Sequence, residues 1–307
     1  IRPELERKGH TFTSDTDTEV IIHAYEEWGV GCVERFNGMW AFAIYDENRK
    51  ELFLSRDRFG VKPLYFCRHE KGLIFSSEIK GILQHSVKRA PNDKAVYDFL
   101  ALGFVDHLPE TFFSGIDRLM PGQSMIYDLS RGSTKFFKWY DKCQDLTAKN
   151  KMMEDKAAKR LRELFMDSVR YRLISDVPVG SCLSGGIDSS SIVYAMRKLS
   201  EIGKIKTFSM VFPGKKQDES SFINEVIAAT GVDAYTVSPS TEDLLKDLAD
   251  LIQTQEEPFG SLSIYGQYKV MQLANKSGMK VLLDGQGSDE IFAGYFIYLK
   301  YYFFESL

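Results

Sequence analysis

The sequence predicts a two-part fold, in which an antiparallel sheet is followed by a doubly wound α/β sheet. Between residues 39 and 77, short runs rich in Phe, Tyr, Leu and Ile alternate with turn residues, which is typical of antiparallel strands. Beyond residue 150, short apolar runs alternate with longer amphipathic segments, and this alternation favours βαβ units and a mainly parallel sheet. A length of 307 residues also favours two domains.

In the amino-terminal part, the first expected element is an amphipathic helix over residues 16–28. Apolar residues recur there at helical spacing, and Gly29 follows as a stop signal. Strands are expected next at residues 39–45, 51–57, 63–68 and 73–77. Residues 90–150 combine prolines, isolated glycines and mixed short runs, which indicates a connecting segment with a boundary near residue 150.

The carboxyl-terminal part begins with a helix that contains Leu161 and Leu173. Strands are expected at residues 177–183, 205–212, 233–238 and 280–284, and helices at 188–200, 219–230, 241–254 and 262–278. In a doubly wound sheet, ligands bind outside the carboxyl ends of the strands. The loops that follow the first, second and last of these strands are therefore the places to search for a site.

Charge and composition exclude several functional classes. The net charge is −4 and the basic residues are scattered, which argues against a nucleic-acid surface. The four cysteines, Cys32, Cys67, Cys143 and Cys182, form no C-x-x-C, which favours a reducing cytoplasm over a zinc site or a disulfide scaffold. No apolar run approaches the roughly 20 residues of a membrane helix. We expect the chain to be cut at both ends, because it starts at Ile1 and stops inside an apolar helical pattern.

Residues 183–190, Leu-Ser-Gly-Gly-Ile-Asp-Ser-Ser, have the composition of an anion-binding turn that opens a helix. Adjacent glycines let backbone N–H groups approach a ligand, and the first helical turn adds unpaired N–H groups. Phosphate suits this turn, with hydroxyl donors from its serines and a divalent cation beside Asp188. An N-capped helix after a turn is the alternative. No G-x-x-x-x-G-K-[ST] occurs in the sequence, which excludes a P-loop.

A second loop of the same kind spans residues 284–290, directly after the apolar run 281–283. Its glycines allow close backbone approach, and carboxylates follow at the start of a helix. We expect Asp289 to ligate a metal, whereas Glu290 equally suits the positive end of the helix dipole. The turn Glu256-Glu257-Pro258 is open to two interpretations, a substrate-facing loop or a solvated acidic turn.

Five motifs follow one another along the chain: RDRFGVKPLYF, SSEIK, SGGIDSS, TFSMVF and DGQGSDE. Together they resemble the glutamine-dependent asparagine synthetase family, and SGGIDSS resembles the pyrophosphate-binding loop of the N-type ATP pyrophosphatases. The resemblance implies an Ntn-type α+β glutaminase fold for residues 1–89, the carboxyl-terminal part of a class II amidotransferase domain. It implies a connecting segment at 90–150. For residues 151–307 it implies the amino-terminal part of a synthetase domain, with an ATP pyrophosphatase (adenine nucleotide alpha hydrolase-like) fold.

The resemblance also implies ATP and Mg²⁺ as ligands, with roles for individual residues. It assigns Leu183 and Met210 to the adenosine, Ser184, Gly185, Gly186, Asp188, Ser189 and Ser190 to pyrophosphate and Mg²⁺, Asp284 and Gly285 to a further nucleotide contact, and Asp289 to Mg²⁺ and pyrophosphate. Asp17 matches an aspartate that holds the α-amino group of glutamine. Gln286 stands where many family members carry a glutamate that helps to form aspartyl-AMP.

The family's glutaminase nucleophile, an amino-terminal cysteine, is absent, so this chain alone is expected to be inactive. The leading hypothesis is amidation of aspartate to asparagine with ammonia from glutamine. Because Gln286 is neutral, amidation of another carboxylate, such as a uronic-acid sugar in surface glycan synthesis, is the runner-up. A non-catalytic nucleotide-binding module is the third hypothesis. Glutamine and aspartate, or a related carboxylate, are the expected partners, and a homodimer is compatible with the resemblance.

Overall fold

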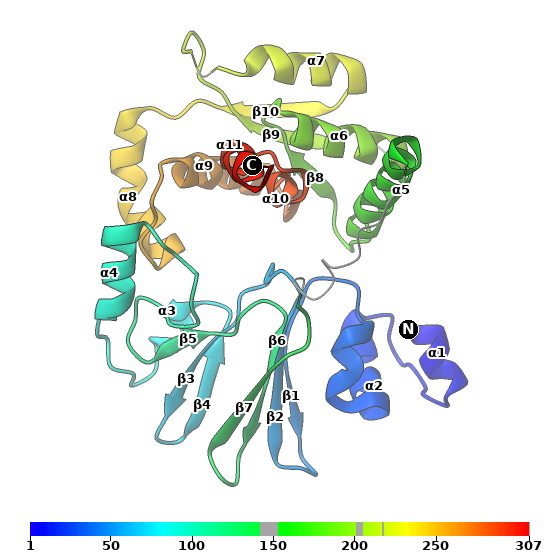
Figure 1. Cartoon of the computed structure of the whole chain (residues 1–307), viewed down its shortest axis with the longest axis vertical. Helices are drawn as coiled ribbons and strands as arrows, with labels where there is room; N and C mark the ends of the chain where they lie inside the picture. The colour runs from blue at the N-terminus through cyan, green and yellow to red at the C-terminus, as the bar shows by residue number, and fades with distance from the viewer. Residues whose placement is uncertain (142–152, 201–204, 217, 307) are drawn as a thin grey trace. The chain divides into compact units, whose positions relative to one another are not determined.

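The computed structural model describes residues 1–141, 153–200, 205–216 and 218–306, so Cys143 and most of the segment 142–155 lie outside the described residues. The chain folds into two compact units (Figure 1). Unit 1 comprises Ile1–Lys149 and Ile252–Gly260, and unit 2 comprises Asn150–Leu251 and Ser261–Leu307. Each unit has its own hydrophobic core, and no described helix is both long and apolar enough to cross a bilayer.

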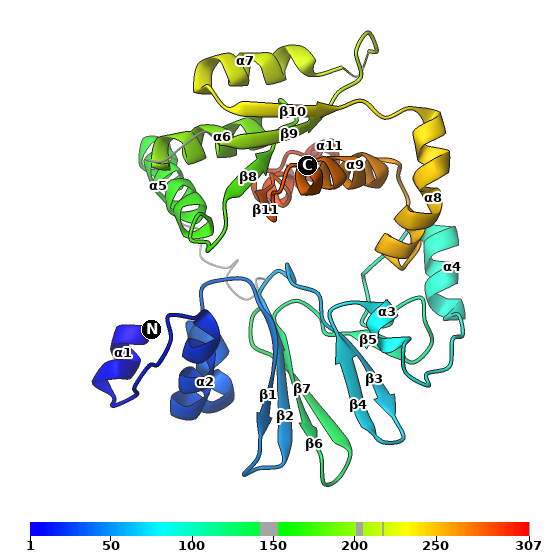
Figure 2. The same cartoon turned by 180° about the vertical axis from the view of Figure 1, so that it is seen from behind.

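Unit 1 contains two antiparallel sheets, which Figure 2 shows as separate ribbons. One sheet has the order β1 (Ala41–Asp46), β2 (Glu51–Arg56), β6 (Gln123–Asp128) and β7 (Ser133–Lys138). The other has the order β4 (Gly72–Ser76), β3 (Tyr65–His69) and β5 (Ile116–Arg118). The helices are α1 (Arg2–Arg7), α2 (Asp17–Trp28), the 3-10 helix η1 (Gly29–Arg35), α3 (Ile79–Ile82) and α4 (Asp93–Leu102).

Alternation along the strands sorts side chains between the two faces of the larger sheet. Phe53 packs on one face with Leu5 and Ala24 of the helices, in a cluster rich in aromatic rings. Its neighbour Leu54 points to the other face and packs against Phe66 of the smaller sheet. Unit 1 is therefore layered, with helices α1 and α2, the larger sheet and the smaller sheet in that order.

The sequence located the strands before residue 77 but did not reveal how they pair. One antiparallel sheet was expected from residues 39–77, whereas β1 and β2 belong to one sheet and β3 and β4 to another. Residues 90–150, for which the pattern suggested a connecting segment, supply β5, β6, β7 and α4 to unit 1. Strand pairing explains the difference. Strand β2 pairs with β6, which lies far along the chain, and β3 belongs to the other sheet.

Unit 2 is built around a parallel sheet with the order β10 (Asp233–Val237), β9 (Lys206–Met210), β8 (Val179–Cys182) and β11 (Val281–Leu283). Its helices are α5 (Glu154–Arg172), α6 (Ile187–Leu199), α7 (Ser220–Thr230), α8 (Thr241–Gln255), α9 (Ser263–Lys276), α10 (Ser288–Phe292) and α11 (Phe296–Ser306). The last residues of α8 fall in the segment 252–260 that belongs to unit 1. These bounds lie close to those that the hydrophobic pattern predicts.

Both faces of the parallel sheet are covered by helices, as the sequence predicts for a doubly wound fold. On one face, Val193 of α6 and Ile223 of α7 pack with Val169 of α5. On the other face, Val270 and Ala274 of α9 form a second cluster with strand residues. The sheet is buried on both sides, and its loops at the carboxyl edge remain accessible for a ligand.

Candidate nucleotide site and glutamine pocket

The two glycine loops of unit 2 lie side by side at the carboxyl edge of the parallel sheet. Strand β8 pairs with β9 on one side and with β11 on the other, and Ser181 is opposite Leu283 in the β8–β11 register. The chain winds outward from β8 through β9 to β10, and then returns to the opposite side of β8 as β11. The loops after β8 and β11 thus meet at the topological switch point, where ligands bind in open α/β sheets.

Serine side chains shape the loop after β8. The Ser184 N–H donates to Ser189 Oγ at 3.1 Å, and the Gly186 N–H donates to Ser184 Oγ at 3.3 Å. Helix α6 begins at Ile187, and its N-cap residue Gly186 makes no side-chain cap. An ordinary side-chain cap at this helix, the alternative considered for the turn, is therefore wrong. The hydroxyl groups hold the loop instead, and the N–H groups of the first helical turn remain available to an anion.

Two glycines allow these loops to pack closely. Gly185 has a φ of 86°, and a Cβ there would lie 2.9 Å from the Cβ of Phe222. A Cβ on Gly285 would lie 3.2 Å from the Cβ of Asp188, so the loop after β11 touches the start of α6. Gly185 is therefore favoured by conformation and by space, whereas Gly285 is favoured by the tight contact with Asp188.

Helices α6 and α10, which follow the two glycine loops, carry oxygen-bearing side chains in their first turns. Asp188 is half-buried in the first turn of α6, and Asp289 is half-buried in the first turn of α10. The buried Oγ of Ser190 has no hydrogen-bond partner within the described ranges. Hard oxygen donors of this kind suit Mg²⁺, which usually keeps several waters and binds through one or two carboxylates and a phosphate. Asp188 and Asp289 belong to no group of three protein ligands in the described part of the chain.

The other residues expected to contact the nucleotide are Asp284, Leu183 and Met210, and some of their polar groups already have partners within the protein. Asp284 accepts a hydrogen bond from Gln267 Nε2 of α9 at 2.8 Å, a partner that no sequence motif marked. Leu183 is buried, its N–H donates to Phe208 O and its carbonyl accepts from Ser209 Oγ. Met210 lies at the end of β9, beside Gly266. Asp284 and Met210 thus lie at the carboxyl ends of β11 and β9. The backbone N–H and carbonyl of Leu183 are already used in hydrogen bonds to Phe208 and Ser209.

The segment after β11 exposes the residue on which substrate choice was predicted to depend. Gln286 is exposed just before α10. Nearby, the hydroxyl of Tyr295 donates to Glu290 Oε1 at 3.0 Å, and this bond raises the pKa of Tyr295. The Asp289 carboxylate occupies the space that a side chain at Gly294 would need. An amide at position 286 can orient a substrate through hydrogen bonds but cannot accept a proton as a base.

In unit 1, Asp17 is the first residue of α2 and lines a pocket of about 580 Å³. Residues of β1, Trp40 just before it and Lys62 also line the pocket. The positive end of the α2 dipole faces this position, so the pocket combines a carboxylate with a helix N-terminus. Such a combination can hold both ends of a zwitterionic amino acid.

Asp57, in the motif RDRFG, organises the backbone around this pocket. Only 1% of the residue is exposed, and its carboxylate accepts four backbone N–H groups. Oδ1 accepts from Phe59 and Val61 at 3.1 and 3.0 Å, and Oδ2 accepts from Trp40 and Lys62 at 3.3 and 3.0 Å. Because Trp40 and Lys62 both line the pocket, Asp57 fixes the pocket wall from behind.

The described cysteines are buried thiols with raised pKa values. Burial raises the pKa of the Cys32 thiol to about 12 and that of the Cys182 thiol to about 12, and it also raises the pKa of Cys67. All three are free and buried. A thiol in this state carries almost no thiolate at neutral pH, which agrees with the expectation that none of them is the glutaminase nucleophile.

The carboxylates of the turn Glu256-Glu257-Pro258 are bonded within unit 1 rather than solvated. Both carboxylates are largely buried inside unit 1, with 10% and 12% of their side chains exposed. Glu256 accepts the N–H groups of Ile79 and Lys80, at 2.8 and 2.7 Å, at the start of α3. The interpretation as a solvated turn is wrong, because orphan N–H groups of a short helix attract a carboxylate.

Comparison with known proteins assigns a family to both units. The chain matches the glutamine amidotransferase domain over residues 1–140 and the asparagine synthase domain over residues 160–306. It is 38% identical, over 97% of its length, to a putative asparagine synthetase [glutamine-hydrolyzing] 2 of Methanocaldococcus jannaschii, of which it covers 58%. It is 33% identical to asparagine synthetase [glutamine-hydrolyzing] 1 of Bacillus subtilis, over 97% of this chain and 46% of that protein.

A third relative has a different name. The chain is 31% identical to the amidase chry2 of Gibberella zeae, over 92% of its own length and 44% of that protein. The chain spans about half the length of these curated relatives. Two domain matches in family order, together with relatives aligned along nearly the whole chain, confirm the resemblance seen in the motifs: the chain belongs to the glutamine-hydrolysing asparagine synthetase family.

Proposed function

We propose that this chain carries the ATP site and part of the glutaminase site of an amidotransferase that converts aspartate into asparagine. In this reaction the side-chain carboxylate of aspartate attacks the α-phosphate of ATP, which gives aspartyl-AMP and releases pyrophosphate. Ammonia from glutamine then attacks the acyl carbon, AMP leaves, and the amide is formed. The observation that supports this proposal best is the contact between Gly285 and Asp188, which joins two phosphate-type loops at the switch point.

The residues of unit 2 have separate tasks in this proposal. The loop 184–190 and the first turn of α6 bind the leaving pyrophosphate through N–H and hydroxyl donors, including the unpaired Ser190 Oγ. Asp188 and Asp289 would hold Mg²⁺, which offsets the phosphate charge. The ATP pyrophosphatase fold for unit 2 and the Ntn-type fold for unit 1 belong to the same proposal, as does Asp17 as the ligand of the glutamine α-amino group.

Amidation of another carboxylate remains the second candidate, because Gln286 is exposed and neutral and because one relative is named an amidase. The three buried free thiols support a reducing compartment, and we propose the cytoplasm.

Binding of Mg²⁺ and ATP to the 307-residue chain tests the nucleotide site directly. We expect D188N to weaken Mg²⁺-dependent ATP binding at least about tenfold, because one charge-assisted contact contributes roughly 1.5–3 kcal/mol. D176N changes an exposed aspartate upstream of β8 and should bind as the unaltered chain does. Equal binding by D188N and the unaltered chain would contradict the site.

Acceptor choice is tested by exchange of labelled pyrophosphate into ATP, measured on the protein that contains this chain. Aspartate-dependent exchange supports the leading function. Exchange that requires another carboxylate favours the second candidate. Tight ATP binding without exchange for any carboxylate would indicate a non-catalytic nucleotide-binding module.

A further inference from the structure

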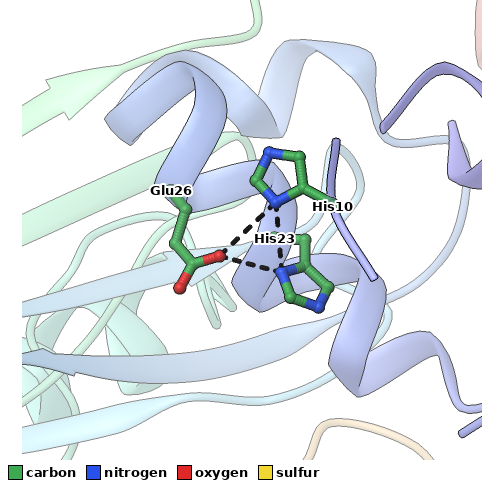
Figure 3. A group of neighbouring side chains, drawn as sticks. All are labelled: His10, His23 and Glu26. Atoms are coloured by element: carbon green, nitrogen blue, oxygen red, sulfur yellow. Dashed lines mark hydrogen bonds and ion pairs between the residues drawn. The ribbon is translucent and has the colours of Figure 1, made fainter. Parts of the chain in front are cut away.

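Two of the five histidines of the chain, His10 and His23, lie close together in unit 1 and belong to none of the five sequence motifs. His23 and Glu26 project from α2 one helical turn apart, and His10 approaches from the segment between α1 and α2 (Figure 3). The two rings lie 5.0 Å apart between centroids, and the ring of Phe12 packs edge-on against His23. The imidazoles are thus held in place by packing before any ligand is considered.

Three ligand atoms converge between these side chains. His10 Nδ1 lies 3.3 Å from His23 Nδ1, and Glu26 Oε2 lies 2.8 Å from His23 Nδ1 and 3.6 Å from His10 Nδ1. In a tetrahedral zinc site, metal–ligand bonds of 2.0–2.1 Å place neighbouring ligand atoms about 3.3 Å apart. The observed separations of 2.8, 3.3 and 3.6 Å are centred near that value.

Hydrogen bonds alone satisfy this arrangement only if a single proton on His23 Nδ1 is shared between Glu26 Oε2 and His10 Nδ1. A ring nitrogen carries either one proton or one lone pair. His23 Nδ1 therefore cannot donate to Glu26 at 2.8 Å and also accept from His10 at 3.3 Å. A cation at the centre of the triangle would accept all three lone pairs at once.

The outer nitrogens of both rings face carboxylates. His10 Nε2 lies 3.3 Å from Glu27 Oε2, and His23 Nε2 lies 3.8 Å from Glu19 Oε1. Glu27 also pairs with Lys8 Nζ at 2.6 Å, and Glu19 accepts the backbone N–H groups of Thr13 and Ser14, each at 2.7 Å. Ionised carboxylates behind the rings favour protons on Nε2 and leave Nδ1 free to bind a metal.

We propose that His10 Nδ1, His23 Nδ1 and Glu26 Oε2 form a binding site for one divalent transition-metal ion of the zinc type. This is the one group of three such side chains that comes together within the described residues. Two imidazoles and a carboxylate are a familiar zinc ligand set. Glu26 is 55% exposed, so a fourth position is open to water. The ion would fasten the segment that leads to Thr16 and Asp17 onto α2.

Titration of the metal-free chain with Co²⁺ alone, followed by displacement with Zn²⁺, tests the site. We expect one equivalent of Co²⁺ to give visible d–d bands typical of low coordination number, and one equivalent of Zn²⁺ to remove them. H10Q and H23Q should each weaken Co²⁺ binding more than about 100-fold, and E27Q should weaken it about tenfold, as outer carboxylates do.

H107Q is the matched control. His107 Nε2 also lies beside a carboxylate, 3.0 Å from Asp98 Oδ2, but no second imidazole joins that pair. H107Q should bind Co²⁺ as the unaltered chain does. E26Q keeps the shape of an exposed side chain, so it preserves the fold and still loses a ligand. Absence of stoichiometric Co²⁺ binding, or equal affinity in H10Q, H23Q, E26Q and H107Q, would overturn the proposal.

Discussion

Glu257 forms an ion pair with Arg118, and its oxygens Oε1 and Oε2 accept hydrogen bonds from Nη2 at 2.9 and 2.8 Å. Oε1 also accepts the backbone N–H of Phe112 at 2.9 Å. Arg118 is 5% exposed and has Asp106 as a further partner. The segment 252–260 thus completes the polar interior of unit 1, although it follows most of unit 2 in the sequence.

Replacement of Glu257 by alanine should destabilise unit 1 by about 3 kcal/mol. The loss leaves the buried Arg118 with Asp106 alone and removes the acceptor of Phe112, and breaking a buried ion pair costs roughly 3–5 kcal/mol when no partner remains. Urea unfolding measures the change. E70A, which removes an exposed glutamate from the turn between β3 and β4, should leave the midpoint unchanged. Equal midpoints for the two variants would show that the pair does not stabilise the fold.

D57N should destabilise unit 1 by about 2–3 kcal/mol, although the two side chains have nearly the same shape. In either orientation, the amide places an NH₂ group against two of the four backbone N–H donors, and bonds to charged groups contribute roughly 1.5–3 kcal/mol each. Thermal unfolding followed by circular dichroism tests this expectation. E47Q neutralises an exposed acid in the turn after β1 and is the matched control. A D57N midpoint within error of E47Q would contradict the role of Asp57.

G185A should lower the stability of unit 2 by about 1–3 kcal/mol more than G214A, because only the first introduces a steric clash. Both glycines have positive φ, 86° and 75°, so both variants strain the backbone. A Cβ at Gly185 meets Phe222, whereas nothing lies within 4 Å of a Cβ at Gly214. Chemical denaturation of the two variants separates backbone strain from crowding. Equal losses would mean that the loop tolerates the added methyl group.

Asp247 should make stability depend on pH in the acidic range. Hydrogen bonds from Lys269 and Tyr265, each 2.8 Å long, lower the pKa of its carboxyl group in the folded state. The stabilisation is therefore complete above the unfolded pKa of about 3.9 and is lost as the pH falls through the lower folded pKa. D247N should be less stable than the unaltered chain at pH 7, and the gap should shrink below about pH 4. E242Q, on the same helix, should show a small gap at every pH.

The fold of unit 2 was predictable because local patterns and global topology agree there. Each strand of its parallel sheet is a short apolar run bounded by turns, and each crossover is a helix with one apolar stripe. Unit 1 was less predictable because antiparallel pairing joins distant segments. The apolar pattern of Leu52 and Leu54 shows that they alternate with residues on the other face, but it does not show that their partner is β6.

The position of the two glycine loops at the ends of β8 and β11 was predictable, because each loop directly follows a short apolar run in the sequence. Gln267 was not, because its contact with Asp284 depends on how α9 packs against the sheet. The role of Glu256 at α3 was not foreseen, and the pair of His10 and His23 was missed, for the same reason. Their neighbours lie 177 and 13 residues away in the sequence, and no short motif encodes such distances.

The return of residues 252–260 into unit 1 has a consequence for synthesis on the ribosome. When residue 149 has emerged, α3 still lacks the carboxylate that covers its first N–H groups, and Arg118 still lacks Glu257. Unit 1 therefore stays unfinished until most of unit 2 has been translated. A gene cut between the two would yield a first half with a missing piece, and supplying residues 252–260 as a separate peptide should restore it.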